Sequence, residues 1–157
     1  MEEYIFVRSI DKEYINEIYK ILFSCGMHML KQGLFHWVKP YSKNAIKHDC
    51  ETKKVILVQD KDTGMYTSTF QMYVSENNDF YVSKIATNPN VEGKGIGKKN
   101  IQYMEAYAKK CGCSKLCLDV YKKSSRAINF YQKCGFKIVG ERKARLFSEF
   151  VMEKNVQ

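Results

Sequence analysis

The sequence predicts an α/β fold with a mixed central sheet and flanking helices, and three features carry that prediction. Several short segments of the first half alternate apolar with polar residues or run entirely apolar, as strands do. Two longer segments repeat their apolar residues every three or four positions, which is typical of an amphipathic helix. Between residues 80 and 120 a strand, a glycine-rich turn, a helix and another strand follow one another, which indicates a parallel β-α-β crossover.

The first segments are a predicted strand and two helices. The strand covers Tyr4 to Ser9, and Asp11 is expected to cap the next helix because its carboxylate can accept from the free N–H groups of the first turn. Gly33 breaks that helix, and Ser42 is expected to cap a shorter one that runs through Glu51. The buried stripe of the first helix is Ile15, Ile18, Leu22, Cys25 and Met29.

Three further strands are predicted to form an antiparallel meander. Polar turns at residues 60–64 and 76–79 separate them. Val55 to Val58 is continuously apolar, as expected of a strand covered on both faces, and the third strand is Phe80 to Thr87. The apolar residues of the alternating second strand are Phe70, Met72 and Val74.

The second half completes the crossover and ends in a hairpin. After the crossover helix, Leu116 to Val120 reads as a strand, Ser124 is expected to cap a further helix, and Gly135 is expected to end it in the left-handed conformation. Two last strands, 136–141 and 146–153, are predicted to pair at the edge of the sheet. The apolar seam of the crossover helix is Gly97, Ile101, Met104, Ala108 and Cys111.

The composition is that of one soluble globular domain covering residues 1–157. Hydrophobic residues make up 45% and charged residues 27% of the chain. No apolar run approaches the roughly twenty residues that span a bilayer. The acidic start Met1-Glu2-Glu3 lacks the basic and apolar regions of a secretion signal. We therefore expect a cytoplasmic protein with no membrane partner.

Positive charge is in excess, with 26 Lys and Arg against 17 Asp and Glu for a net charge of +9. Such a surface attracts phosphorylated cofactors or nucleic acid. The basic segment Lys137 to Arg145 could contact a nucleic-acid backbone, but we favour a solvated hairpin because Phe147 is its only nearby aromatic residue. Nucleic-acid binding is therefore disfavoured.

Six cysteines are expected to be reduced, mostly core thiols, since a chain of this size needs no disulfides and lacks an export signal. Cys111 and Cys113 are separated by one residue rather than two, and His28, His36 and His48 complete no zinc spacing with them. We expect no metal site.

A glycine-rich turn follows the strand that ends at Thr87. Glycines at alternate positions let the backbone approach a ligand closely, and the first N–H groups of the next helix attract anionic oxygens. Lysines add positive charge, so the turn suits a pyrophosphate group. The turn consists of Glu92, Gly93, Lys94, Gly95, Ile96, Gly97 and Lys98.

Two familiar phosphate-binding motifs do not fit this turn. A nucleoside-triphosphate loop ending at Gly97-Lys98 requires glycine at Glu92 and serine or threonine at Lys99. A dinucleotide-binding fingerprint requires a glycine at Lys98, three residues after Gly95. Nucleoside triphosphates and dinucleotides are therefore disfavoured.

Two segments, residues 92–97 and Ser124 to Phe136, together match the signatures of one family in order and separation. The G-x-G spacing, with Glu92 three residues before Gly95, resembles the Gln/Arg-x-x-Gly-x-Gly/Ala turn of the GNAT N-acetyltransferase superfamily. The later segment, S-S-R-A-I-N-F-Y-Q-K-C-G-F, resembles that family's A-x-x-F-Y-x-x-x-G-F motif. The resemblance extends from about Tyr66 to Lys154 and implies the GNAT fold.

The resemblance implies how the chain would hold acetyl-CoA. In the GNAT fold the two central parallel strands splay apart, so the backbone of one strand can bond the pantetheine amides. The glycine-rich turn would bind the pyrophosphate, and Asn129 would reach the cofactor unless it is an ordinary polar surface residue. The backbone groups that would meet the pantetheine, unless they pair as in an ordinary sheet, belong to Ile85, Ala86 and Thr87.

The resemblance also implies the reaction, a direct transfer of acetyl to a primary amine without an acyl-enzyme. Tyr131 matches the tyrosine that protonates the departing thiolate in many members, although its helical spacing from Ala127 and Cys134 also suits a core aromatic residue. His36 and Trp37 are candidates for lining an acceptor pocket, although core packing is favoured for Trp37 and His36 is not expected to be catalytic. The acceptor, a small-molecule or protein amine, stays open. The alternative is a catalytically silent CoA-binding sensor or subunit, and a homodimer is compatible with both.

Two residues depart from the family pattern. Glu92 stands where Gln or Arg is usual, and its carboxylate would repel a pyrophosphate unless it turns away or pairs with Lys94. Lys84 stands where some relatives carry an acidic residue, so its ammonium would suit a carboxylate-bearing substrate and cannot act as a base. The proton acceptor is unassigned, and water could carry the proton instead. Four carboxylates are candidates, although a solvated charge is the favoured interpretation of each: Glu76, Asp79, Asp119 and Glu149.

Overall fold

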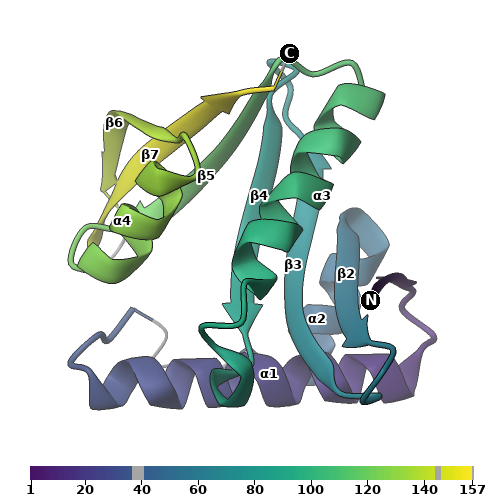
Figure 1. Cartoon of the computed structure of the whole chain (residues 1–157). Coiled ribbons are helices and arrows are strands. Elements are labelled where there is room, and N and C mark those ends of the chain that lie inside the picture. Colours follow the sequence, from purple (N-terminus) through teal and green to yellow (C-terminus); the bar gives the residue numbers. More distant parts are fainter. Residues whose placement is uncertain (37–40, 144–145, 157) are drawn as a thin grey trace. The chain divides into compact units, whose positions relative to one another are not determined.

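The computed structural model describes residues 1–36, 41–143 and 146–156, and its elements follow the predicted order (Figure 1). A short 3-10 helix, η1, precedes the glycine-rich turn. In chain order the elements are β1 (Glu2–Val7), α1 (Lys12–Lys31), α2 (Lys43–Thr52), β2 (Lys54–Asp60), β3 (Tyr66–Val74), β4 (Phe80–Thr87), η1 (Pro89–Val91), α3 (Ile96–Lys110), β5 (Lys115–Tyr121), α4 (Ser125–Lys133), β6 (Lys137–Lys143) and β7 (Ser148–Asn155).

Within this part of the chain the strands form a seven-stranded mixed sheet in the order β1-β2-β3-β4-β5-β7-β6. β4 and β5 are parallel, whereas β1 with β2, β2 with β3, β5 with β7 and β6 with β7 are antiparallel. The predicted α/β class, with a meander, a parallel crossover and flanking helices, is confirmed. The chain forms two compact units, unit 1 (Met1–Met72 and Lys84–Ile96) and unit 2 (Tyr73–Ser83 and Gly97–Gln157).

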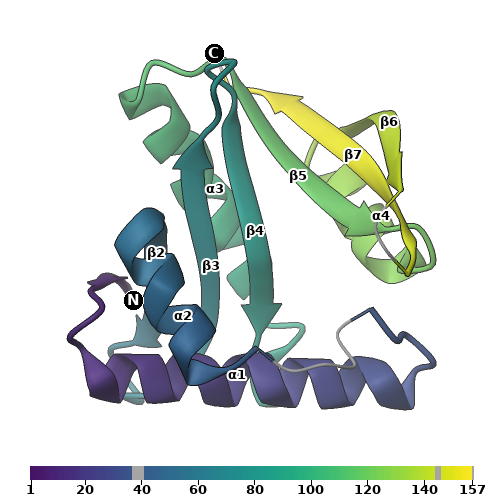
Figure 2. The same cartoon turned by 180° about the vertical axis from the view of Figure 1, so that it is seen from behind.

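The core of unit 1 lies between the two N-terminal helices and one face of the first strands. α1 and α2 contact one another, as both views show (Figures 1 and 2). Their apolar residues pack against one face of β1 and β2. Val7 pairs with Val55 and Ile5 with Leu57, so these four side chains lie on that face. Of the predicted stripe, Ile15, Ile18 and Leu22 are buried together with Ile21, while Cys25 and Met29 are half-buried.

The two strands after α2 are covered on both faces. Every residue from Val55 to Val58 is buried, as predicted. β3 differs from its predicted alternation, because Val74 is 47% exposed while polar Thr69 and Gln71 are buried on either side of Phe70. The Thr69 hydroxyl donates to the carbonyl of Ile56 at 2.7 Å, which removes the cost of burying it.

Helix starts show which capping predictions were right. Ser42 caps α2 as predicted, its hydroxyl accepting from the Ala45 N–H at 3.0 Å. Asp11 precedes α1, but its carboxylate accepts instead from the Arg8 N–H at 2.8 Å and pairs with the Arg8 guanidinium at 3.1 Å. Ser124 precedes α4 without a side-chain cap. A charged partner nearby therefore outcompetes the helix for Asp11.

In unit 2 the crossover joins two parallel strands through α3. Phe80 pairs with Leu116 and Tyr81 with Cys117. The predicted seam of α3 is buried at Ile101, Met104 and Ala108, but Cys111 is exposed because the helix ends at Lys110. α4 ends at Lys133, and Gly135 just beyond it has a φ of +98°, the predicted left-handed exit.

The chain ends in the predicted hairpin, with β6 at the edge of the sheet. One of its basic residues, Arg142, pairs with Asp119 at 3.2 Å, and its acidic Glu141 pairs with Lys122 at 3.0 Å. Lys137, Arg142 and Lys143 are exposed, as expected of a solvated charged hairpin. Arg145 lies outside the described residues. None of the described helices is long and apolar enough to cross a membrane.

Candidate active site

The glycine-rich turn exposes its backbone. Gly93 and Gly95 have φ values of +80° and +78°, a conformation that side chains other than glycine adopt at a cost. A Cβ built on either would meet nothing within 4 Å, so open space lies beside both. Glu92 and Lys94 are exposed as well. The peptide groups between them are therefore accessible to a ligand.

The helix that follows carries charge of the unexpected sign at its start. α3 begins at Ile96, and its first turn holds Lys98 and Lys99 with no acidic residue. The N-terminus of a helix already carries partial positive charge, so lysines there are unfavourable unless an anion is present. With exposed glycine peptides before it, this start fits a phosphate group, and the donor set therefore fits the pyrophosphate of CoA.

Gly97 has a different role from the other glycines of the turn. A Cβ at this position would lie 2.9 Å from Cζ of Phe130, so the ring fills the space beside it. The glycine therefore permits close packing of α3 on α4 rather than close approach of a ligand. The contact also places the helix that carries Asn129 and Tyr131 directly against the first turn of α3, within unit 2.

Tyr131 is held among aromatic rings. Its ring contacts Phe130 edge-on with centroids 5.4 Å apart, and Phe136 at 5.6 Å. Tyr131 is half-buried and Asn129 is exposed. The ring is thus fixed by packing, which suits a positioned proton donor as well as a core residue.

The segment Ile85–Thr87 ends β4 in unit 1. The Asn88 N–H donates to the carbonyl of Thr67 at 2.7 Å, toward β3. Because N–H groups alternate along a strand, those of Ile85 and Thr87 point to the opposite edge and that of Ala86 points to the β3 edge. The register of β4 with β5 covers Phe80 and Tyr81, at the other end of the strand.

A thiol and an imidazole lie beside this segment and the turn in unit 1. Burial and the nearby Glu92 carboxylate raise the pKa of Cys25 to about 11, while a hydrogen bond with the Thr87 backbone lowers it. The Glu92 carboxylate also lies 3.7 Å from Nε2 of His28 on α1. Glu92 thus has a partner other than Lys94, which the sequence did not indicate.

The four candidate carboxylates separate into two kinds of site. Glu76 and Asp79 lie in the polar turn at the start of β4, the end opposite Ile85–Thr87. Burial raises the pKa of Asp119, which the Arg142 guanidinium lowers, and Asp119 Oδ1 has no hydrogen-bond partner among the described residues. Burial and the Asp119 carboxylate raise the pKa of Glu149. The last two are therefore not the solvated charges that the sequence favoured.

Three of the cysteines are poor nucleophiles. Burial raises the pKa of Cys50 to about 11 and that of Cys117 to about 12. Burial also raises the pKa of Cys134, the thiol nearest the second motif. Since the thiolate is the reactive form, none of these three is activated. All six thiols are free, with Cys113 and Cys117 buried and Cys111 exposed.

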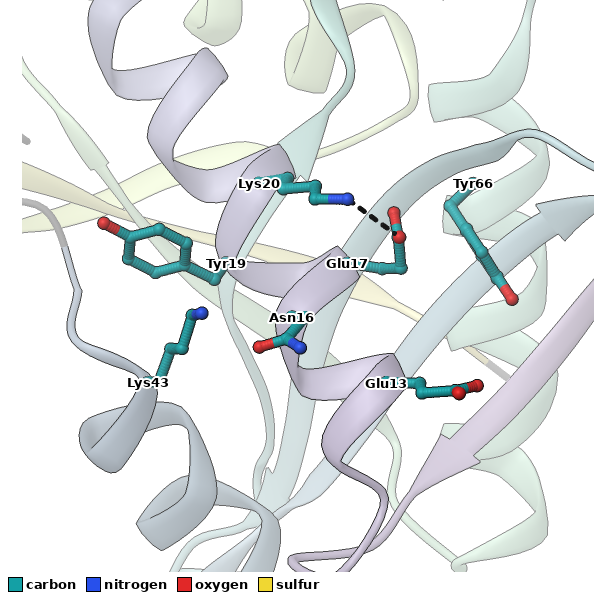
Figure 3. A pocket seen from close by; sticks show the side chains of 7 residues that line it. All are labelled: Glu13, Asn16, Glu17, Tyr19, Lys20, Lys43 and Tyr66. Carbon is teal, nitrogen blue, oxygen red and sulfur yellow. Dashed lines mark hydrogen bonds and ion pairs between the residues drawn. The ribbon is translucent and has the colours of Figure 1, made fainter.

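A surface hollow of about 410 Å³ lies on the outer side of α1 in unit 1 (Figure 3). Lys43 of α2 and Tyr66 of β3 complete its rim. Its lining mixes both signs of charge, including a Glu17–Lys20 ion pair at 3.2 Å. None of the predicted site residues lines it, and we assign it no role.

Unit 1 contains a polar cluster that the sequence did not predict. Asp49, on α2, pairs with the ammonium of Lys84 at 2.5 Å and accepts from Nε2 of Gln71 at 2.9 Å. Lys84 is therefore already neutralised, which corrects the expectation that it would suit a carboxylate-bearing substrate.

The two residues expected to line an acceptor pocket are His36 and Trp37. Burial lowers the pKa of His36, and Trp37 lies outside the described residues.

These features define an α/β protein with an exposed glycine-rich turn at a basic helix start, and comparison with known proteins gives the family. Residues 15–136 match the acetyltransferase (GNAT) family, and the chain belongs to that family. It is similar to the solved ribosomal-protein-S18-alanine N-acetyltransferase from Escherichia coli, at 16% identity and a TM-score of 0.78, over 100% of this chain and 95% of that one.

Two further solved relatives carry a ligand. The PaiA N-acetyltransferase from Thermoplasma acidophilum, in complex with coenzyme A, is 20% identical with a TM-score of 0.75 over 99% of both chains. A GNAT family acetyltransferase from Elizabethkingia anophelis, with acetyl-CoA bound, is 18% identical with a TM-score of 0.65, over 73% of this chain and 83% of that one. The predicted family and fold are confirmed, and the predicted cofactor is the one these relatives bind.

Proposed function

We propose that this protein transfers acetyl from acetyl-CoA directly to a primary amine. The observation that carries the proposal is the exposed left-handed turn at Gly93 and Gly95, which leads into a helix whose first turn is basic and packs against α4. Bound acetyl-CoA would supply an activated acetyl thioester. The chain's own part is to hold the phosphates, align the amine and move two protons.

The turn and the helix start would hold the pyrophosphate. Backbone N–H groups from Gly93 to Gly97 act as donors, and Lys94 and Lys98 supply positive charge. Asn129, exposed on α4, would hydrogen-bond the cofactor. The outward N–H groups of Ile85 and Thr87 would bond pantetheine amides, whereas Ala86 would contribute its buried side chain to the strand's packing.

Tyr131 and Asp119 are proposed as the two proton carriers. An amine with a pKa near roughly 10.4 is mostly protonated at neutral pH, so a base must accept a proton before attack. Asp119 suits this because burial raises the pKa of its carboxyl toward the working pH. Tyr131, fixed by Phe130 and Phe136, would donate a proton to the departing sulfur.

The state of three thiols supports transfer without an acyl-enzyme. Burial raises the pKa of Cys25, Cys117 and Cys134, so each stays protonated near neutral pH. A covalent route would need an activated thiolate beside a base. Attack by the amine itself needs neither an activated thiolate nor a base beside such a thiolate.

We propose that residues 1–157 act as one catalytic domain and that the reaction takes place in the cytoplasm.

The test combines binding and turnover. Calorimetry should show uptake of CoA by the folded chain, and release of free thiol from acetyl-CoA should rise on adding one of a panel of amines, both small molecules and peptides. Binding without turnover on any amine would favour the silent CoA-binding alternative. Absence of CoA binding would overturn the proposal altogether.

A further inference from the structure

Lys84 has an unusual backbone conformation for its place in the chain. It lies inside β4 with a φ of +50°, which only glycine adopts without strain. The other such residue apart from glycine in the described chain, Asn78, lies in a tight turn, where this conformation is ordinary. A left-handed residue inside a strand interrupts its alternation and resets which edge the following peptides face.

The ammonium group of Lys84 is held by neighbouring side chains. Its ammonium lies 2.5 Å from Asp49 Oδ2 and 4.2 Å from the centre of the Tyr41 ring. The side chains of Lys84 and Asp49 are only 18% and 9% exposed. Gln71 of β3 holds the same carboxylate oxygen at 2.9 Å. Helix α2 and strand β3 therefore fix the ammonium, and the residue that carries it cannot move freely.

We propose that Asp49 and Lys84 act together as a positioning pair that sets the direction of the peptide groups from Ile85 to Thr87. The ion pair offsets the strain at Lys84, and the strained residue turns the N–H groups of Ile85 and Thr87 away from β3. Neither side chain would touch substrate. The inference rests on the proposed function only for the use of those peptide groups, to bind CoA.

The pair does not act as an acceptor site or as an acid and base. Lys84 is already neutralised by Asp49, and little of either side chain is exposed to solvent. An ordinary structural ion pair would stabilise the fold without regard to the backbone at residue 84. The positioning role makes a different prediction. Glycine adopts a positive φ without strain, so glycine at residue 84 should preserve CoA binding without the ion pair.

The experiment compares three lysine variants by calorimetry with CoA and by amide hydrogen exchange of the free protein. Lys84→Ala should weaken CoA binding by about tenfold or more, since an unfastened alanine leaves the left-handed region. Lys84→Gly should recover most of that affinity. Lys20→Ala, which removes a lysine from the exposed Glu17 pair, is the control and should match the unaltered protein. Asp49→Asn should behave like Lys84→Ala.

Exchange separates this inference from the proposed function. In the free protein, the amides of Ala86 and Asn88, which point toward β3, should exchange faster in Lys84→Ala and Asp49→Asn than in Lys20→Ala, whether or not CoA binds. If the unaltered chain binds no CoA but exchange changes as expected, the proposed function fails and the pair stands. Unchanged exchange, or equal loss of CoA affinity in Lys84→Gly and Lys84→Ala, would overturn the positioning role.

Discussion

The ring of Phe130 occupies the space that a side chain at residue 97 would need. An added Cβ on Gly97 would lie 2.9 Å from Phe130 Cζ and 3.4 Å from Cε1, so the first turn of α3 and the middle of α4 are in direct contact. Both motifs that identify the family therefore meet at one residue pair within unit 2.

Gly97→Ala should destabilise the fold by about 1–3 kcal/mol, because the new methyl group overpacks the contact with Phe130. Urea unfolding monitored by circular dichroism measures the change. The double variant Gly97→Ala with Phe130→Leu should recover part of the loss, since leucine leaves room for the methyl group. Additive losses in the double variant would show that the two positions do not compete for the same space.

Gly95→Val should weaken CoA binding by about tenfold or more, because a branched residue at a φ of +78° distorts the turn. Gly64→Val is a matched control. Gly64 has a φ of +74° in the β2–β3 turn, and a Cβ there also meets nothing within 4 Å. Both variants should lose similar stability, while only Gly95→Val should lose affinity in calorimetry. Equal affinities would contradict the role of the turn.

Glu92→Gln should tighten CoA binding by about fivefold, because it removes a negative charge close to the proposed diphosphate position. The gain should shrink as salt is added, since an exposed carboxylate is screened. Titration of CoA at low and high ionic strength measures it, with Glu3→Gln on β1 as the control. Unchanged affinity would show that the carboxylate, held toward His28, does not act on the ligand.

Tyr131→Phe should lower kcat by on the order of 100-fold while leaving the Kd for CoA nearly unchanged, because only the proton donor is removed. Phenylalanine keeps the ring contacts with Phe130 and Phe136, so the fold should be preserved. Thiol release and calorimetry supply the two readouts. Equal turnover would leave Tyr131 with a packing role alone.

Local patterns in the sequence were sufficient to predict the order of the elements and the glycine-rich turn. Turn residues, apolar periodicity and the need for glycine at positive φ each act over a few residues, so they can be read without knowing the fold. Ser42 and Gly135 were predicted correctly on this basis. The prediction that Asp11 caps α1 was wrong, because capping rules do not consider a competing partner such as Arg8.

The missed contacts join residues that are distant in the chain. Asp49 and Lys84 are 35 positions apart, and no periodicity relates a helix residue to a strand residue. One signal was nonetheless present, because Asp49 lies three residues after Ile46 on the buried side of α2. A carboxylate on a buried helix face requires a partner. Asp119 was likewise mistaken for a solvated charge because its burial depends on neighbouring strands.

The proposed base is testable through its neighbour. If Asp119 accepts the proton from the amine, kcat/KM should rise with pH as its carboxyl loses a proton, so the acid limb of the profile reports its pKa. Burial raises that pKa and the Arg142 guanidinium lowers it. Arg142→Gln should therefore move the acid limb to higher pH, and Asp119→Asn should abolish the limb with most of the activity. Lys143→Gln, one position along β6, is the control. An acid limb unmoved in Arg142→Gln would assign the proton to another acceptor.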